Sequence, residues 1–296
     1  MTPTIKDILK CYPSIAKAER VKTGGPGAET VTNAIRGTRK VCRAAGIALG
    51  SGIDNLTRQN IDKALVVFME QGLSRMSAWS YAGQLRAIFA RWCLPYYKDI
   101  GWDIPPLELP TFRAKPPRYV RPPHDILKRV RPWYERIRDK YVWFAATMML
   151  EFAMRNSDVL RLKRENFIEK DSKIYLNYTP HKTALSSGRR VMWPIHEKIW
   201  RKMKRIIGKT PEDFAAFAQG FNSGAFTALN KQVRALGFHG HKASYELRKI
   251  CIDHIYQQYG VEMAVSISGD SIKTISYYYA DPSQPNIGAI RIIDLL

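Results

Sequence analysis

The sequence has few cysteines, few acidic residues and no long apolar run. Its four cysteines lie far apart, and no two of them form a Cys-x-x-Cys pair. This spacing argues against a zinc ribbon and against a disulfide-stapled scaffold, and it favours a reducing compartment. The apolar runs fall well short of the ~20 residues that a membrane-spanning helix needs, and the N-terminal segment has no signal-peptide pattern. We therefore expect a cytoplasmic protein without membrane contact.

Basic residues, by contrast, are abundant. The 47 Lys and Arg outnumber the 26 Asp and Glu, which gives a formal net charge of +21 in 296 residues. Such an excess repels itself in a compact chain unless an anionic partner compensates, and nucleic acid is the commonest partner of this kind. With 45% hydrophobic residues the chain can still bury a core. A nucleic-acid-associated globular protein is the expected class.

Prolines divide the chain. Seven of the 17 fall between positions 105 and 123, and because proline fixes φ and removes a donor, this stretch should be extended. We expect a helical domain over residues 1–104, a linker over 105–123 and a second domain over 124–296. The linker is also basic, and four of its residues are candidate phosphate contacts: Arg113, Lys115, Arg118 and Arg121.

Helical periodicity dominates the first domain. Apolar residues recur with a 3.6-residue period over positions 31–42, Thr57 is a candidate N-cap for a second helix and Ser77 for a third. About 25 residues precede the first clear helix. The pattern predicts a small helical bundle, with Arg75 and Arg86 as candidate DNA contacts.

The second domain reads as mainly α with a small β-hairpin or sheet, an α+β arrangement. A strongly apolar helix is expected over residues 141–152. Strands are expected over 173–178 and 189–195, because the first alternates apolar and polar residues and the segment between them has the composition of a hairpin loop. Further helices are expected over 199–207, 225–236, 245–258 and 272–279.

Four segments of this domain carry candidate chemistry. Arg155 follows the apolar helix in EFAMRNSDVLRL, Lys182 lies on the expected hairpin loop, and Arg248 lies in YELRK. The fourth segment, SIKTISYYY, ends in three adjacent tyrosines. Taken alone, each of these residues is most simply a surface charge or a packed aromatic ring. The order of the four segments along the chain is more specific evidence for a function than any one of them.

In this order the chain resembles the tyrosine recombinase (phage integrase) family, over about residues 130–280 and more loosely over 25–105. The resemblance implies that Arg155 and Arg248 bind the scissile phosphate and that Asp158 accompanies the first arginine. It also implies that Lys182 is the catalytic lysine. The ungapped alignment of SGDSIKTISYYYADP with the family's closing motif puts Tyr278 on the nucleophile.

The chain departs from the family at two histidine positions. Tyr245 stands where the family usually has the first histidine, and Gly269 stands where it has the second. Shifting the alignment of the closing motif by one residue would instead place Asp270 at the position of that second histidine and make Tyr279 the nucleophile. His241, four residues before Tyr245, is a further candidate for an imidazole. We prefer Tyr278, because Ile272 and Thr274 keep their usual distances to it in the family's motif, and Tyr279 and His241 remain as alternatives.

These residue types suit metal-free phosphodiester cleavage. Two guanidiniums supply fork-shaped donors to phosphate oxygens, an ammonium can protonate the leaving oxygen, and a phenol forms a covalent phosphodiester that allows rejoining. The sequence lacks an evident carboxylate cluster for two metal ions, so no metal and no cofactor are expected.

The sequence-based hypothesis is therefore a site-specific recombinase that acts on double-stranded DNA through a 3′-phosphotyrosyl intermediate and is associated with DNA in the cell. The resemblance further implies a homotetramer on DNA, in which the apolar tail 287–296 docks on a neighbour or, alternatively, on its own core. Two other functions remain open: a catalytically inactive DNA-binding protein on the same fold, and an enzyme of the type IB topoisomerase or telomere resolvase kind.

Overall fold

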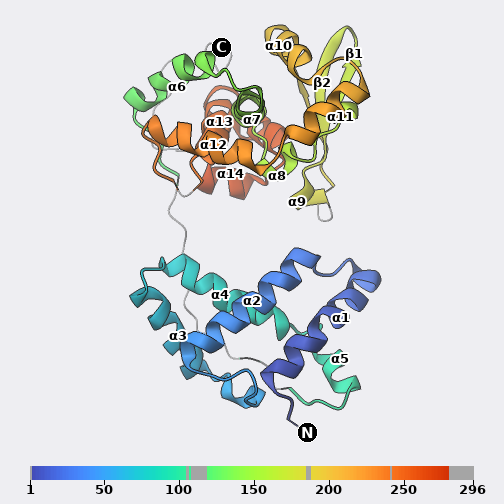
Figure 1. The fold of residues 1–296 in the computed structure, drawn as a ribbon, viewed down its shortest axis with the longest axis vertical. Helices are drawn as coiled ribbons and strands as arrows, with labels where there is room; N and C mark the ends of the chain where they lie inside the picture. The colour runs from blue at the N-terminus through green and yellow to red at the C-terminus, as the bar shows by residue number, and fades with distance from the viewer. Residues whose placement is uncertain (1, 105–106, 108–118, 185–187, 241, 280–296) are drawn as a thin grey trace. The chain divides into compact units, whose positions relative to one another are not determined.

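The computed structural model describes all residues except 1, 105–106, 108–118, 185–187, 241 and 280–296. The chain divides into two compact units, Met1–Pro116 and Pro117–Leu296 (Figure 1). Most of the expected linker and the apolar tail lie outside the described residues. None of the described helices is long and apolar enough to cross a membrane.

The first unit is a helical bundle with its own apolar core. α2 packs against α3 and α4, and α1 packs against both α2 and α4. Apolar side chains at helical spacing, such as Ile61, Leu65 and Phe68 of α3, are buried between these helices. The helices are α1 (Ile5–Thr23), α2 (Ala28–Ala45), the short 3-10 turn η1 (Ile53–Asn55), α3 (Arg58–Glu70), α4 (Arg75–Ile88) and α5 (Leu94–Asp99).

Two expectations for this unit need correction. A helix already begins at Ile5, because Thr4 and Asp7 form a reciprocal capping box at its N-terminus, so the first helix is not preceded by about 25 residues. Thr57 is confirmed as an N-cap, since its side chain accepts from the Asn60 backbone N–H. The cap of α4, however, is Ser74, and Ser77 instead donates its backbone N–H to the Ser74 side chain at 3.2 Å.

The second unit combines helices with a three-stranded antiparallel sheet of order β1-β2-β3. The predicted pairing of β2 (Lys173–Tyr178) with β3 (Val191–Pro194) is confirmed, and the sequence missed β1 (Phe167–Lys170), which pairs with β2. The helices are α6 (His124–Arg136), α7 (Lys140–Leu150), α8 (Asn156–Val159), η2 (Arg164–Asn166), α9 (His181–Ala184), α10 (Glu197–Ile207), α11 (Pro211–Gly220), α12 (Ser223–Ala235), α13 (Tyr245–Ser268) and α14 (Ile272–Tyr278).

The centre of this unit is α7, with α12 and α13 packed against it (Figure 1). Every residue of α7 from Val142 to Leu150 is buried. Phe144 meets Phe217 and Phe221 edge-on, at ring-centroid distances of 5.0 and 5.3 Å. A helix buried on all sides is a rigid element, so it fixes the segment that follows it, where Arg155 lies.

Two glycines shape the C-terminal helices. Gly260 has non-helical backbone angles and kinks α13, and Gly269 ends α13 in the left-handed conformation (φ 67°). A Cβ at Gly269 would lie 2.8 Å from Pro180 Cγ, so the chain has to be glycine there to pass close to the β2–α9 connection. Directly after this turn come Asp270 and α14.

Candidate functional site

Two buried arginines from distant parts of the second unit come together. Arg155 is the N-cap residue of the short helix α8, directly after the segment that follows α7. Arg248 lies in the first turn of α13. Arg155 is 9% exposed and Arg248 is fully buried. Arginine is almost never buried without charged or polar partners, so the surroundings of these two side chains define the candidate site.

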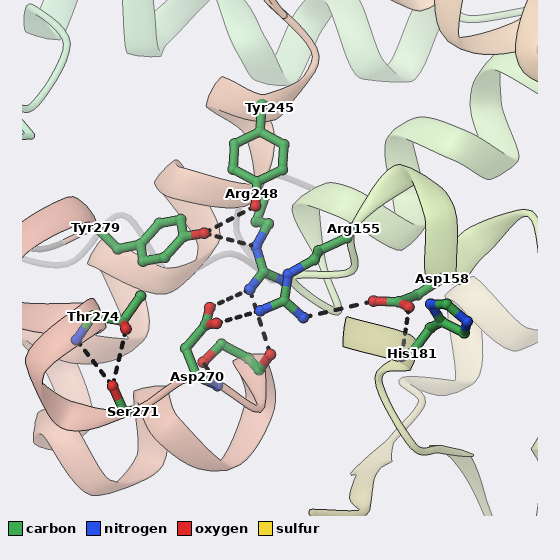
Figure 2. Close-up of polar contacts among 10 residues, drawn as sticks. Arg155, Asp158, His181, Tyr245, Arg248, Asp270, Ser271, Thr274 and Tyr279 are labelled. Atoms are coloured by element: carbon green, nitrogen blue, oxygen red, sulfur yellow. Dashed lines mark hydrogen bonds and ion pairs between the residues drawn. The ribbon is translucent and has the colours of Figure 1, made fainter. Parts of the chain in front are cut away.

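The carboxylate of Asp270 bridges the two arginines (Figure 2). Arg155 Nη2 donates to Oδ1 of Asp270, and Arg248 Nη2 donates to Oδ2 at 2.5 Å. Arg248 Nη2 also lies 3.4 Å from the Ser268 backbone oxygen. Asp270 itself is held by its backbone N–H, which donates to the Ser268 side chain. Each carboxylate oxygen therefore binds one guanidinium, which fixes both forks relative to each other.

Asp158 completes this group, here called the arginine cluster: Arg155, Arg248, Asp158 and Asp270. Its Oδ2 lies 3.7 Å from Nη1 of Arg155, and its Oδ1 accepts from the backbone N–H of His181 at 2.9 Å. The first contact lies within α8, and the second connects α8 to the start of α9 (Figure 2). Asp158 thus positions both Arg155 and the connection that carries Lys182.

Two phenols lie on the other side of Arg248. The hydroxyl of Tyr279 lies 2.9 Å from the hydroxyl of Tyr245 and 3.5 Å from Arg248 Nε (Figure 2). Burial raises the pKa of Tyr279 while the Arg248 charge opposes that rise. Burial alone would lower the pKa of Arg248, but Tyr279, Tyr245 and Asp270 outweigh it and the pKa is raised. Tyr279 is therefore a neutral phenol beside a permanent cation.

Tyr279 and Tyr278, the alternatives left open by the sequence, have different environments. Tyr278 is 43% exposed, and its ring packs edge-on against Tyr277 at 4.8 Å. Tyr279 is 6% exposed and donates its backbone N–H to Ile275, which is itself fully buried. Residues four apart share one face of a helix, so Tyr279 follows the buried face of Ile275 into the cluster. This spacing is the sequence signal that distinguishes the two tyrosines.

The other predicted site residues fall into three groups. Lys182 lies on α9 and is exposed. Arg121, predicted to contact DNA, donates its Nε to the buried Asp253 carboxylate at 2.6 Å, so it has an intramolecular ion pair that the sequence did not reveal. The remaining predicted residues of the linker and the loop before α13 lie outside the described residues: His241, Arg113, Lys115 and Arg118.

In the first unit, the candidate DNA contacts Arg75 and Arg86 of α4 are both exposed. Sequence reasoning missed a more concentrated basic surface on α2. A groove of about 420 Å³, here called the α2 groove, is lined by Thr32, Ile35, Arg36, Arg39, Lys40 and Arg43. Its four basic residues recur at i, i+3, i+4 and i+7, which was the available signal. Lys40 Nζ lies 2.6 Å from the Tyr81 hydroxyl.

Two further buried titratable residues of the second unit were missed. Tyr178 of β2 is buried, which raises its pKa, and the charges of Arg248, Asp158, Arg155 and Asp270 all act on it. Glu151, at the end of α7, is buried, and burial raises its pKa well above the usual range. The alternation of β2 distinguishes the faces of the strand, and it gives no signal of the charged groups around Tyr178.

Chemically, this arrangement can bind an oxyanion and present a phenol to it. Two guanidiniums with fixed forks are suited to phosphate or carboxylate oxygens, and Asp270 already shows such a contact. No group of three or more His, Cys, Asp or Glu side chains that could hold a metal ion occurs in the described part of the chain.

Solved structures with the same architecture are known. A lambda integrase dimer bound to a COC′ core site has a TM-score of 0.67 and 16% identity, covering 98% of this chain and 100% of that chain. XerH site-specific recombinase in a post-cleavage complex with a palindromic difH substrate has a TM-score of 0.62 and 14% identity, covering 93% and 82%.

The Tn1549 transposon integrase in complex with a circular intermediate DNA has a TM-score of 0.57 and 14% identity, covering 93% of this chain and 95% of that chain. No protein-family model and no curated protein sequence matches the chain. The likeness therefore lies in the three-dimensional arrangement, extends over both units and confirms the family resemblance at the level of the fold. The chain has the tyrosine recombinase fold.

Proposed function

We propose that this protein is a site-specific DNA recombinase that cuts and rejoins DNA strands through a phosphotyrosyl intermediate. One observation carries the proposal: two buried arginines from separate segments converge with the hydroxyl of a buried tyrosine. A strand transferase needs these components, since guanidiniums stabilise the charge that develops on the phosphate oxygens while a phenol attacks.

In this proposal Tyr279 is the nucleophile. Its hydroxyl lies next to Arg248 and Tyr245, whereas Tyr278 is 43% exposed. Because the pKa of Tyr279 is raised, its proton has to leave as the bond to phosphorus forms. The hydroxyl of Tyr245, 2.9 Å away, can accept that proton while it passes its own proton to solvent water, because Tyr245 is only partly buried. Tyr245 thus takes the part that the family usually gives to histidine.

Arg155 and Arg248 bind the non-bridging oxygens of the scissile phosphate, and Lys182 protonates the leaving 5′-oxygen. The position of Lys182 in the chain supports this role, because the preceding residue, His181, donates its backbone N–H to Asp158 of the arginine cluster. An ammonium on this short segment is thus tethered next to the cluster, and an ammonium is a donor that can give a proton to the leaving oxygen.

The α2 groove, with Arg75 and Arg86, supplies further contacts to the phosphate backbone. Arg36, Arg39 and Arg43 are exposed, and none of them makes an ion pair with another described residue. Free surface guanidiniums attract phosphates and release counterions. The similar lambda integrase and XerH structures hold DNA, and one lambda integrase structure is a tetramer on a Holliday junction; a tetramer on duplex DNA is the assembly we propose here.

A suicide substrate tests the proposal. This is a nicked duplex whose cleavage releases a short strand and so traps the covalent complex. Wild-type protein should form a covalent protein–DNA adduct, Tyr279→Phe should form none, and Tyr278→Phe should retain it as a matched control. If wild type binds the duplex and forms no adduct, the protein is a non-catalytic DNA-binding protein on this fold. A product that needs one duplex rather than two would identify a topoisomerase-like or resolvase-like enzyme.

A further inference from the structure

The side chain of Asp270 lies between the two arginines in a position that suits an anion. Its two carboxylate oxygens bind Nη2 of Arg155 and Nη2 of Arg248, respectively (Figure 2). We propose that Asp270 is an internal substitute for the scissile phosphate, which blocks the arginine pair in the free protein and which DNA has to displace. This inference rests on the proposed function, because it assigns a regulatory role within the same site.

Geometry favours a substitute over a simple support. The two carboxylate oxygens of Asp270 are joined to one carbon, and each binds a different guanidinium. The two non-bridging oxygens of a phosphate, joined to one phosphorus, would bind Arg155 and Arg248 in the same way. Asp270 is 8% exposed, and both arginines are more than nine-tenths buried. A phosphate cannot take these donors while the carboxylate holds them, so the two anions compete for one position.

Charge leads to the same conclusion. The arginine cluster has two positive side chains, Arg155 and Arg248, and two negative ones, Asp158 and Asp270. A phosphodiester that entered this neutral group would add an unpaired negative charge in a buried place, which is costly. If the Asp270 carboxylate leaves, the phosphate restores the same balance.

Asp270 is also the carboxylate that can leave. Asp158 lies within α8 and accepts from the His181 backbone, whereas Asp270 belongs to the short connection between α13 and α14, next to Gly269 in the left-handed conformation. A glycine turn is a place where backbone angles change at low cost. Because α14 follows directly and Tyr279 comes at its end, a movement of Asp270 out of the cluster would also change the position of the nucleophile.

Some hydrogen-bond donors around the Asp270 carboxylate are not satisfied by it, and a phosphate could bind them. Arg248 Nη1 and the Tyr178 hydroxyl are buried and have no hydrogen-bond partner among the described residues, and Arg155 Nη1 has only the 3.7 Å ion pair with Asp158. Both oxygens of the Asp270 carboxylate already accept from a guanidinium, whereas a phosphodiester has two bridging oxygens besides its two non-bridging ones, and inorganic phosphate has four oxygens. Buried donors without partners are costly, so a larger oxyanion satisfies this site better than Asp270 does.

Phosphate-dependent thermal stability tests the inference without requiring catalysis. In phosphate-free buffer, Asp270→Asn should unfold at a lower temperature than wild type, because two buried guanidiniums lose their anion. Inorganic phosphate should restore the unfolding temperature of the variant. The phosphate concentration that gives half of this effect should be roughly tenfold or more below the concentration that gives half of any stabilisation of wild type. Asp253→Asn, which removes a buried carboxylate from the Arg121 pair, is the matched control and should show no such restoration.

Asp270→Ser is the second variant, in case the amide disturbs folding. If neither variant folds with or without phosphate, or if both fold and phosphate restores neither, Asp270 is a fixed counter-ion and the inference is wrong. Restoration in either variant supports it.

The suicide substrate separates this inference from the proposed function. Asp270→Asn should reach half-maximal adduct formation at a lower DNA concentration than wild type. If wild type forms the adduct and the variant reacts more slowly at saturating DNA with an unchanged half-maximal concentration, Asp270 is a positioning residue and the inference fails alone. If neither forms an adduct while phosphate still restores the variant, the proposed function fails, and what remains of the inference is that Asp270 occupies an anion-binding position.

Discussion

The arginine cluster and the α2 groove hold their positive charges in opposite ways. In the cluster, Arg155 and Arg248 are buried and their forks are fixed by Asp270. In the α2 groove, Arg36, Arg39 and Arg43 are exposed and make no ion pair with another described residue. Buried, fixed donors suit one phosphate at the site of chemistry, and exposed flexible donors suit many phosphates without regard to sequence.

The largest expected effect comes from replacing the fork of a cluster arginine while keeping its charge. Arg248→Lys should slow adduct formation on the suicide substrate by on the order of 10²–10³, because an ammonium cannot offer the phosphate the planar fork of donors that a guanidinium provides. The control is Arg201→Lys on α10, an exposed residue that pairs with Glu197. Equal rates for Arg248→Lys and wild type would show that the guanidinium fork of Arg248 is not needed for cleavage.

In the α2 groove the expected change is in affinity and its salt dependence. Replacing Arg36, Arg39 and Arg43 together by Ala should weaken duplex binding and reduce the slope of log affinity against log salt by about 2.7, which is ~0.9 per lost phosphate contact. The unfolding midpoint in urea should not change, because these side chains are exposed. A slope identical to that of wild type would show that the groove does not contact DNA.

Glu151, at the end of α7, tests the cost of burying a charge in the second unit. Burial raises its pKa, so the carboxyl is preferentially neutral in the folded state. Its contribution to stability is complete below the unfolded pKa and is lost as the pH rises toward the folded pKa. Glu151→Gln should therefore be more stable relative to wild type at pH 8 than at pH 5, because only wild type pays for burying a charge as the pH rises. Urea unfolding at both pH values measures this difference, and equal differences would contradict it.

The smallest effect distinguishes two left-handed glycines, one in each unit. Gly269→Ala and Gly46→Ala both force an alanine to positive φ, which costs about 1–2 kcal/mol. A Cβ at Gly46 meets nothing within 4 Å, whereas one at Gly269 approaches Pro180. Urea unfolding should show Gly269→Ala as the less stable variant, and adduct formation should fall in that variant alone. If the two variants are equally stable, the close approach is unimportant.

Sequence reasoning succeeded where a pattern repeats over several residues. The apolar helix α7, the β2–β3 pairing and the cap at Thr57 all follow from periodicity and local hydrogen bonding. It failed at α1, where the capping box of Thr4 and Asp7 was overlooked although both residues are visible in the sequence. These are local interactions, and local rules describe them.

The candidate site was harder to predict, because its contacts join segments far apart in the chain. The order of motifs identified Arg155 and Arg248, but no local rule places the Asp270 carboxylate between them. The choice between Tyr278 and Tyr279 depends on which face of α14 is buried, and that face is set by packing around Ile275. The ion pair of Arg121 with Asp253 is likewise a tertiary contact without a sequence signal.

Mapping the covalent link most directly tests the central claim that a tyrosine hydroxyl held beside a buried arginine attacks the phosphate. The protein is trapped on a suicide substrate, digested, and the peptide that carries the nucleotide is sequenced by mass spectrometry. The account predicts a phosphotyrosyl bond on Tyr279 to the 3′ end of the cleaved strand. A link to Tyr278 or Tyr277, or a 5′ linkage, would contradict it.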